Sequence, residues 1–345
     1  MNAAIIPYQH AAGLQPLRYL TADFLMPVAG KPLAEHLVEY CVSSGISTIL
    51  LLVDDDPGAV ERYFGSGERW GAIITVQAVD AEVPLVTQLA SIFSALAGPI
   101  CCFPANMLVT GDFAAIAAHA MADPLPIVPG TAGDAAFCVV DGTVMHKAVQ
   151  ACGNADYYGL LEFLRGSATQ QPDCAGIQCR LLTSLDEYLA AQRALLDESW
   201  PGARILAARR EQGIWIGDHV TLDQQITLIP PLLIGHHSTV SGTGTIGPNA
   251  VIAPFCLINN TDLIEESVLL PGTATGPHTE LSHLVVLGSR IVNARSGVCV
   301  TAPDAFILGD LQDSGQGQPV PASWYRWWVL AAALTALVWF FFVRR

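Results

Sequence analysis

The chain has 345 residues, of which 52 % are hydrophobic, and its mean hydropathy of +0.42 is high for a soluble protein. This length allows two ordinary domains and an appendage. The formal net charge of −15 argues against a nucleic-acid partner, because binding to a polyanion needs clustered lysine and arginine. The nine cysteines are scattered without a CxxC pair, which indicates reduced thiols rather than a zinc ribbon or a disulfide framework.

Strands and helices are expected to alternate through residues 1–200. Ala3–Ile6 predicts a short strand, and Ile46–Val53 a strand buried on both faces, because it is apolar throughout. Pro32 opens a predicted helix that Gly45 ends. Repeated βα units predict a mostly parallel sheet with helices on both faces, an α/β fold of Rossmann-like type. The pattern continues with a helix (Pro57–Phe64), a strand (Ala72–Gln77), a helix (Thr87–Leu96), a strand (Pro99–Phe103) and a helix capped by Asp112 (Phe113–Ala120).

A six-residue period runs from residue 216 to residue 270, within a predicted domain at 205–310. Ten successive positions, six residues apart, carry Ile, Leu or Val. Such hexads are typical of a β-helix, in which each aliphatic side chain points into one stacked core. We therefore expect a second domain of hexapeptide repeats. The ten positions are 216, 222, 228, 234, 240, 246, 252, 258, 264 and 270.

The C-terminal segment Trp324–Val343 is apolar apart from Arg326. Twenty helical residues span about 30 Å, the thickness of the hydrocarbon core of a bilayer, and tryptophans cluster at one end as they do at membrane interfaces. We expect a single transmembrane helix at 324–343 after a flexible linker at 311–323. The thiols and the absence of a signal-peptide pattern favour a cytoplasmic body anchored to the cell inner membrane.

Four sequence islands stand out: MPVAGKPL at 26–33, YFGSG at 63–67, SLDEYLAA at 184–191 and IGP at 246–248. These islands resemble the sugar-phosphate nucleotidyltransferase family, particularly its mannose-1-phosphate guanylyltransferase-like members. Many members carry a left-handed β-helix after the catalytic domain, so the resemblance implies that handedness here. It also implies an enzyme that joins a nucleoside triphosphate to a sugar 1-phosphate with Mg²⁺.

The residues that the family uses for catalysis are replaced in this chain. Aligned with the family motifs, Gly13 stands at the catalytic arginine, and Asp23 at the lysine that contacts phosphate. Asn106 and Leu181 stand at the two aspartates that bind the metal, and 84–89 lacks the glycines that bind the base. Losing cations and gaining an acid near phosphate is unfavourable, and Mg²⁺ prefers carboxylates. We therefore expect no catalytic residues and no cofactor, with Mg²⁺ needed only if the chain is active.

Four other features allow a functional and a structural interpretation. Lys31 is a weak candidate for substrate binding, with a solvated lysine as the alternative. Asp54–Asp56 are able to bind a metal or to end a strand before a helix. His236, His237, His278 and His283 suit an acyltransferase or plain turns, and Cys101-Cys102 is expected in a strand core.

The sequence thus favours a catalytically inactive, membrane-anchored scaffold or regulatory subunit in surface polysaccharide or glycoconjugate biosynthesis. Expected partners are the bilayer, a second copy of the chain, and a glycosyltransferase or an active nucleotidyltransferase. Two alternatives remain open. One is an active nucleotidyltransferase that makes an NDP-sugar of the GDP-mannose type, and the other is a hexapeptide acyltransferase.

Overall fold

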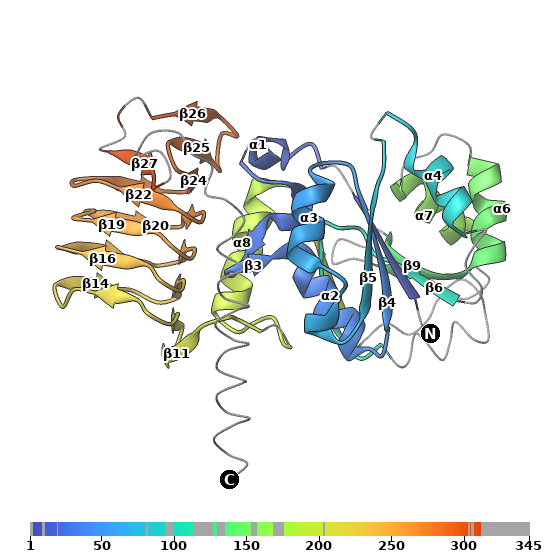
Figure 1. Ribbon diagram of the computed structural model, residues 1–345, viewed down its shortest axis with the longest axis horizontal. Coiled ribbons are helices and arrows are strands. Elements are labelled where there is room, and N and C mark those ends of the chain that lie inside the picture. The colour runs from blue at the N-terminus through green and yellow to red at the C-terminus, as the bar shows by residue number, and fades with distance from the viewer. Residues whose placement is uncertain are drawn as a thin grey trace, which may run out of the picture.

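A six-stranded sheet of order β5-β4-β1-β6-β9-β8 forms the N-terminal part of the computed structural model (Figure 1). The structure describes residues 3–8, 11–18, 20–80, 82–93, 99–113, 127–129, 135–152, 157–167, 176–202, 204–302, 304 and 307–311. Strands β1, β4, β5 and β6 are parallel as predicted, whereas β9 is antiparallel to both β6 and β8. The strands are β1 (Ala3–Pro7), β4 (Thr48–Val53), β5 (Ile73–Ala78), β6 (Pro99–Cys102), β8 (Ile127–Pro129) and β9 (Ala135–Asp141).

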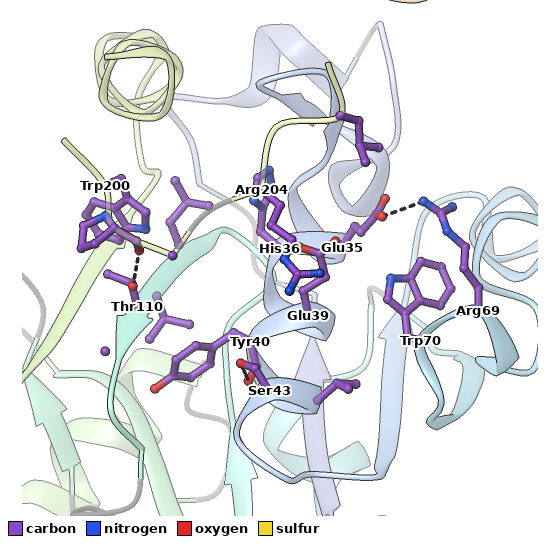
Figure 2. A pocket seen from close by; sticks show the side chains of 17 residues that line it. Glu35, His36, Glu39, Tyr40, Ser43, Arg69, Trp70, Thr110, Trp200 and Arg204 are labelled. Atoms are coloured by element: carbon purple, nitrogen blue, oxygen red, sulfur yellow. Dashed lines mark hydrogen bonds and ion pairs between the residues drawn. The ribbon is translucent and has the colours of Figure 1, made fainter. Parts of the chain in front are cut away.

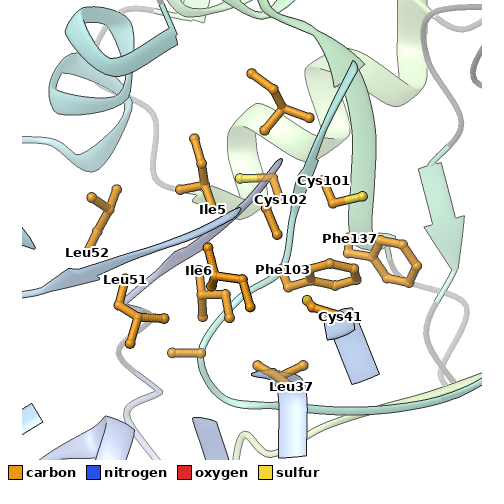
Figure 3. Close-up of a cluster of buried hydrophobic side chains, with 14 of the residues drawn as sticks. Ile5, Ile6, Leu37, Cys41, Leu51, Leu52, Cys101, Cys102, Phe103 and Phe137 are labelled. Carbon is orange, nitrogen blue, oxygen red and sulfur yellow. The ribbon is translucent and has the colours of Figure 1, made fainter. Parts of the chain in front are cut away.

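Both faces of this sheet are covered. Successive residues of a strand point to opposite faces, and the neighbours Ile5 and Ile6 are both fully buried (Figure 3). Cys101 and Cys102 are likewise 0 % exposed, so the prediction that they belong to a strand core is confirmed. The cysteines in the described part of the chain are all free thiols.

The helices form the two covering layers. Figure 1 shows α2 and α3 on one side of the sheet and α4, α6 and α7 on the other. Leu33, Leu37 and Cys41 of α2 are fully buried, as their shared face predicts. The predicted helix Phe113–Ala120 lies outside the described residues apart from Phe113. The helices are α1 (Gln15–Arg18), η1 (Asp23–Leu25), α2 (Leu33–Ser43), α3 (Pro57–Phe64), η2 (Glu68–Trp70), α4 (Leu85–Phe93), α6 (Gly142–Cys152), α7 (Tyr157–Ser167) and α8 (Leu185–Leu196).

Two short strand pairs lie outside the main sheet. β7 (Met107–Gly111) pairs antiparallel with β10 (Ile177–Leu181). β2 (Pro27–Val28) and β3 (Lys31–Pro32) form a hairpin whose turn residues, Ala29 and Gly30, have φ of 48° and 85°. The amide of Gln192 on α8 closes this turn, because it accepts a hydrogen bond from Ala29 N at 2.6 Å and donates one to Pro27 O at 2.8 Å.

The C-terminal part is a β-helix with three faces of parallel strands. The first face contains β12 (Ile214–Ile216), β15 (Leu232–Ile234), β18 (Ala250–Ile252), β21 (Val268–Leu269) and β24 (Leu284–Leu287), flanked by the antiparallel strands β11 (Ala208–Glu211), β25 (Arg290–Asn293) and β26 (Cys299–Thr301). The second contains β13 (Thr221–Leu222), β16 (Thr239–Ser241), β19 (Leu257–Asn259) and β22 (Thr273–Thr275), with β27 (Leu308–Asp310) antiparallel at its end. The third contains β14 (Ile226–Leu228), β17 (Gly244–Ile246), β20 (Leu263–Glu265) and β23 (Glu280–Ser282).

The hexad prediction is confirmed for nine positions and wrong for the tenth. Positions 216 to 264 pack in the interior of the β-helix. At β21, however, the residue paired with Ile252 is Leu269, which lies in this interior, whereas Leu270 belongs to a different cluster. The coil there is one residue shorter, so the strict period of six ends before residue 270.

The β-helix packs directly against the N-terminal part. Outward-facing Leu233, Val251 and Val285 share a buried cluster with residues of α8 (Figure 1). The hairpin turn approaches closely as well, since a Cβ added at Gly30 would lie 2.9 Å from Leu233 Cδ2. The first face of the β-helix is therefore buried on both sides.

Within the described residues, no helix has both the length and the hydropathy needed to cross a membrane. The predicted span 324–343, and the linker apart from Leu311, lie outside the described residues.

Candidate functional site

The position expected for a catalytic arginine is occupied by backbone. Gly13 precedes α1 and forms an isolated parallel bridge with Ser184. A Cβ built on Gly13 would lie 2.4 Å from the Thr183 carbonyl oxygen and 3.0 Å from Ser184 Cα. Real Cβ atoms do not approach this closely, so the arginine is missing and the space for it is closed as well. Gln9 and His10, from the same motif, lie outside the described residues.

Asp23, at the family's lysine position, belongs to a cluster of charges near the carboxyl end of β4. Arg18 lies 3.5 Å from Asp23, 3.4 Å from Asp54 and 4.0 Å from Asp55, measured between nitrogen and carboxylate oxygen. One cation and three acids give 1 − 3 = −2 when all are ionised. Burial raises the pKa of Asp55, and the neighbouring aspartates add to this rise, while the charge of Arg18 opposes it. A cluster with this excess of acid repels a triphosphate.

The two positions expected to bind a metal lie side by side, but neither is a carboxylate. Leu181 pairs with Met107 across the β7–β10 ladder, directly after Asn106. Asn106 Nδ2 donates to Leu182 O at 2.9 Å, and Leu182 N donates to Asn106 O at 2.8 Å. Asn106 is 4 % exposed, and its amide therefore joins two strands in the interior. No group of three or more metal-ligating side chains occurs among the described residues.

The loop before α4, where the family binds the base, is held by Gln88. Its side chain donates to Asp80 O and Val83 O, each at 2.8 Å, and accepts from Asp80 N at 3.1 Å. Leu85 and Val86 are buried in the core. In place of a glycine-rich backbone open to a ligand, this chain has a loop closed by its own glutamine.

Lys31 is buried and ion-paired, which the sequence did not predict. Its side chain is 0 % exposed, and Nζ lies 2.5 Å from Glu39 Oε2. The expectation of a solvated lysine is wrong, because the hairpin carries Lys31 under α2. Its role as a substrate contact stays a prediction, although its charge is already matched by Glu39.

The acidic run and the histidines mostly take structural positions. Asp56 is the N-cap of α3 and accepts a hydrogen bond from Ala59 N at 3.0 Å, so the strand-end interpretation is confirmed for this residue.

His236 Nδ1 accepts from Asp218 N at 2.8 Å, and its Nε2 therefore donates to Leu206 O. The rings of His219, His237 and Phe255 stack on one corner of successive coils. His278 and His283 have φ of 59° and 57°, and are turn residues as well.

Comparisons with known proteins give partial matches. No protein-family model matches the chain. The chain is 32 % identical over 75 residues to the glucose-1-phosphate thymidylyltransferase of Streptomyces antibioticus, a match over 22 % of this chain and 21 % of that protein. This match supports a sugar-phosphate nucleotidyltransferase relationship. The chain thus spans about a fifth of the length of the curated relative that it matches.

A Bacillus anthracis protein classed as a glucose-1-phosphate thymidylyltransferase is similar in structure, with a TM-score of 0.47 and 14 % identity over 56 % of this chain and 94 % of that one.

Sequence reasoning missed Arg18. Its partners lie five residues away in η1 and 36 or more residues away after β4, so only the fold brings them together. One signal was present in the sequence: an arginine that precedes an acid standing in place of the family's lysine.

Proposed function

We propose that the chain is a catalytically inactive nucleotidyltransferase-like subunit that acts as a scaffold or regulator in the assembly of a surface polysaccharide or another glycoconjugate. The observation that carries this proposal is the Gly13–Ser184 bridge, which fills the place of the catalytic arginine. Three further positions agree with it: Asp23 is paired to Arg18, Leu181 ends the strand β10, and the Asn106 amide is bonded to Leu182 next to it.

The proposal includes a membrane anchor at residues 324–343, with the body on the cytoplasmic side of the inner membrane. A tether would keep the body where lipid-linked sugars are transferred. The β-helix would offer an oligomerisation surface, and the partner would be a glycosyltransferase or an active nucleotidyltransferase. The left hand of the β-helix and the guanylyltransferase-like specificity of any ancestral site are part of this proposal.

Catalysis is tested by incubating purified full-length protein with Mg²⁺, each nucleoside triphosphate and a panel of sugar 1-phosphates. The expected result is no release of pyrophosphate above a blank without protein. An authentic glucose-1-phosphate thymidylyltransferase serves as the positive control. Release of pyrophosphate together with an equal amount of NDP-sugar contradicts the proposal and favours the active-enzyme alternative.

The anchor and the partner are tested separately. The full chain is expected in the membrane fraction, and a chain that ends at residue 311 in the soluble fraction. The proteins that co-purify from detergent-solubilised membranes then identify the partner. If the full chain and the shortened chain distribute equally between the fractions, the anchor is wrong, whatever the outcome of the activity assay.

A further inference from the structure

A cavity of about 840 Å³ lies away from the positions that the family uses for catalysis. Its walls are one side of α2, the η2 turn, the end of β7, and residues 200–202, 204 and 206 (Figure 2). Gly13, Asp23, Asn106 and Leu181 do not line it. The volume falls within the range of small-molecule sites, about 300–1,000 Å³.

Tryptophans lie in two walls of this cavity. Trp70 belongs to η2, and Trp200 follows α8 on another wall (Figure 2). The guanidinium of Arg69 lies over the Trp70 ring at 4.7 Å, and that of Arg180 lies 5.8 Å from the Trp200 ring centre. Two large indole side chains give the cavity apolar surface suited to a ring-shaped ligand.

The charges that line the cavity balance, in a chain whose net charge is −15. Glu35 is buried and is neutralised by Arg69 at 2.9 Å, and Glu39 is neutralised by the buried Lys31 at 2.5 Å. Arg204 is exposed and forms no ion pair with any residue that the structure describes. Counting Arg69 and Arg204 against the two glutamates gives 2 − 2 = 0 for the lining, and the buried Lys31, which does not line the cavity, adds one cation next to Glu39.

The two arginines that line the cavity keep donors available. The Arg69 side chain is 53 % exposed, and the ion pair to Glu35 joins one of its terminal nitrogens. A guanidinium has five N–H donors in a planar fork, which matches the oxygens of a phosphate group. Arg204 brings a second guanidinium from the opposite segment of the wall.

We propose that this cavity binds a phosphorylated ring compound, with its ring between Trp70 and Trp200 and its phosphate on Arg204 and Arg69. Nucleotides and sugar phosphates share this chemistry. The site would give the chain a way to respond to such a metabolite without turning it over. It is separate from the positions on which the inactive-subunit proposal depends.

Binding is measured by calorimetry and tryptophan fluorescence on full-length protein in non-ionic detergent, with GDP, glucose 1-phosphate and inorganic phosphate as probes. We expect saturable binding of at least one of the two ring compounds, with a change in fluorescence, and weaker binding of inorganic phosphate. GDP and glucose 1-phosphate distinguish the two sources of the ligand. A flat titration with both ring compounds to millimolar concentration overturns the proposal.

The matched variants are Arg204→Gln and Arg210→Gln. Both remove one exposed cation from the same region, but Arg210 does not line the cavity. Losing a charge-assisted contact to phosphate weakens binding by about tenfold, so Arg204→Gln is expected to do so while Arg210→Gln binds as wild type. Arg204 is chosen because replacing Arg69 would leave Glu35 buried without its cation. Equal affinities of wild type and Arg204→Gln overturn the assignment, because the ligand then binds elsewhere.

Discussion

Gly13 and Ser184 are backbone partners in a parallel bridge, although 170 residues of chain separate them. The bridge brings the Thr183 carbonyl to within 2.4 Å of the place that a Gly13 Cβ would occupy. Restoring the family arginine by Gly13→Arg should therefore restore no activity. Instead, the steric conflict with backbone should lower the free energy of unfolding by about 2–4 kcal/mol, as measured by urea denaturation.

Gly58→Ala is the control for that experiment. A Cβ at Gly58 would meet Arg62 Nη1 at 3.5 Å and Asp56 Oδ1 at 3.8 Å, which are ordinary contacts. Alanine favours the helix by up to about 1 kcal/mol, so stability should stay level or rise. Pyrophosphate release by Gly13→Arg, with its stability unchanged, would show that the position has room for an arginine and that catalysis can be restored.

Asn106→Asp tests the position at which the family resemblance implies a metal-binding aspartate. The change removes the donor to Leu182 O and places a carboxylate near that carbonyl in a site that is 4 % exposed. We expect a loss of about 2–4 kcal/mol in the free energy of unfolding at neutral pH. The loss should shrink in acid, where a protonated carboxyl is again able to donate.

The exposed Asn259 provides the matched control, since Asn259→Asp keeps the oxygen that accepts from Asn260 and should cost less than about 0.5 kcal/mol. Mg²⁺ should not rescue Asn106→Asp. A rise in its denaturation midpoint with Mg²⁺, absent in wild type, would mean that the position is still able to hold a metal.

The sequence predicted those parts of the fold that depend on periodicity. Hexads at 216 to 264 predicted the β-helix, because each coil repeats the same burial. The period failed at Leu270, because one coil is a residue shorter and the inward position is Leu269. Both residues are leucine, so the sequence alone does not show which of them points inward.

The candidate site was less predictable, because it depends on contacts between distant residues. The motif alignment located Gly13 and Asn106, but it did not show that Thr183 closes one position or that Leu182 ties the other. The cavity beside α2 was missed entirely. Its walls combine α2 with the neighbours Arg69 and Trp70 and with Trp200 and Arg204, and these three parts lie far apart in the sequence.

Removing one partner of the buried ion pair between Lys31 and Glu39 should lower the free energy of unfolding substantially. Glu39→Gln would leave the Lys31 ammonium, which is 0 % exposed, without a counter-charge. We expect a loss of about 3 kcal/mol in the free energy of unfolding, and the double variant Lys31→Met, Glu39→Gln should recover most of it. The surface pair of Arg209 and Glu198, 3.1 Å apart and half-exposed, is the control, and Glu198→Gln should cost less than about 1 kcal/mol. If Glu39→Gln and Glu198→Gln cost the same, Lys31 reaches solvent.

His36 should make the protein less stable as the pH falls below the usual pKa of histidine. It is buried at the cavity wall, and its Nε2 donates to Val28 O at 2.9 Å. Burial, and then the charge of Lys31, lowers its pKa from 6.5 to about 3. Above pH 6.5 the ring is neutral in both states and contributes nothing. Below it, the unfolded chain binds a proton that the folded chain does not. The free energy of unfolding should then fall by about 1.4 kcal/mol per pH unit until the pH approaches 3.

His36→Gln isolates this contribution from that of the carboxylates. Glutamine is able to donate to Val28 O without titrating, so the variant should lose less stability than wild type between pH 6.5 and pH 4.5. His278→Gln is the control, because the His278 side chain is 85 % exposed and the substitution should leave the pH dependence unchanged. Urea midpoints measured across this range give the comparison. Parallel curves for wild type and His36→Gln would mean that His36 accepts its proton within the folded protein, and that the cavity wall opens to water in acid.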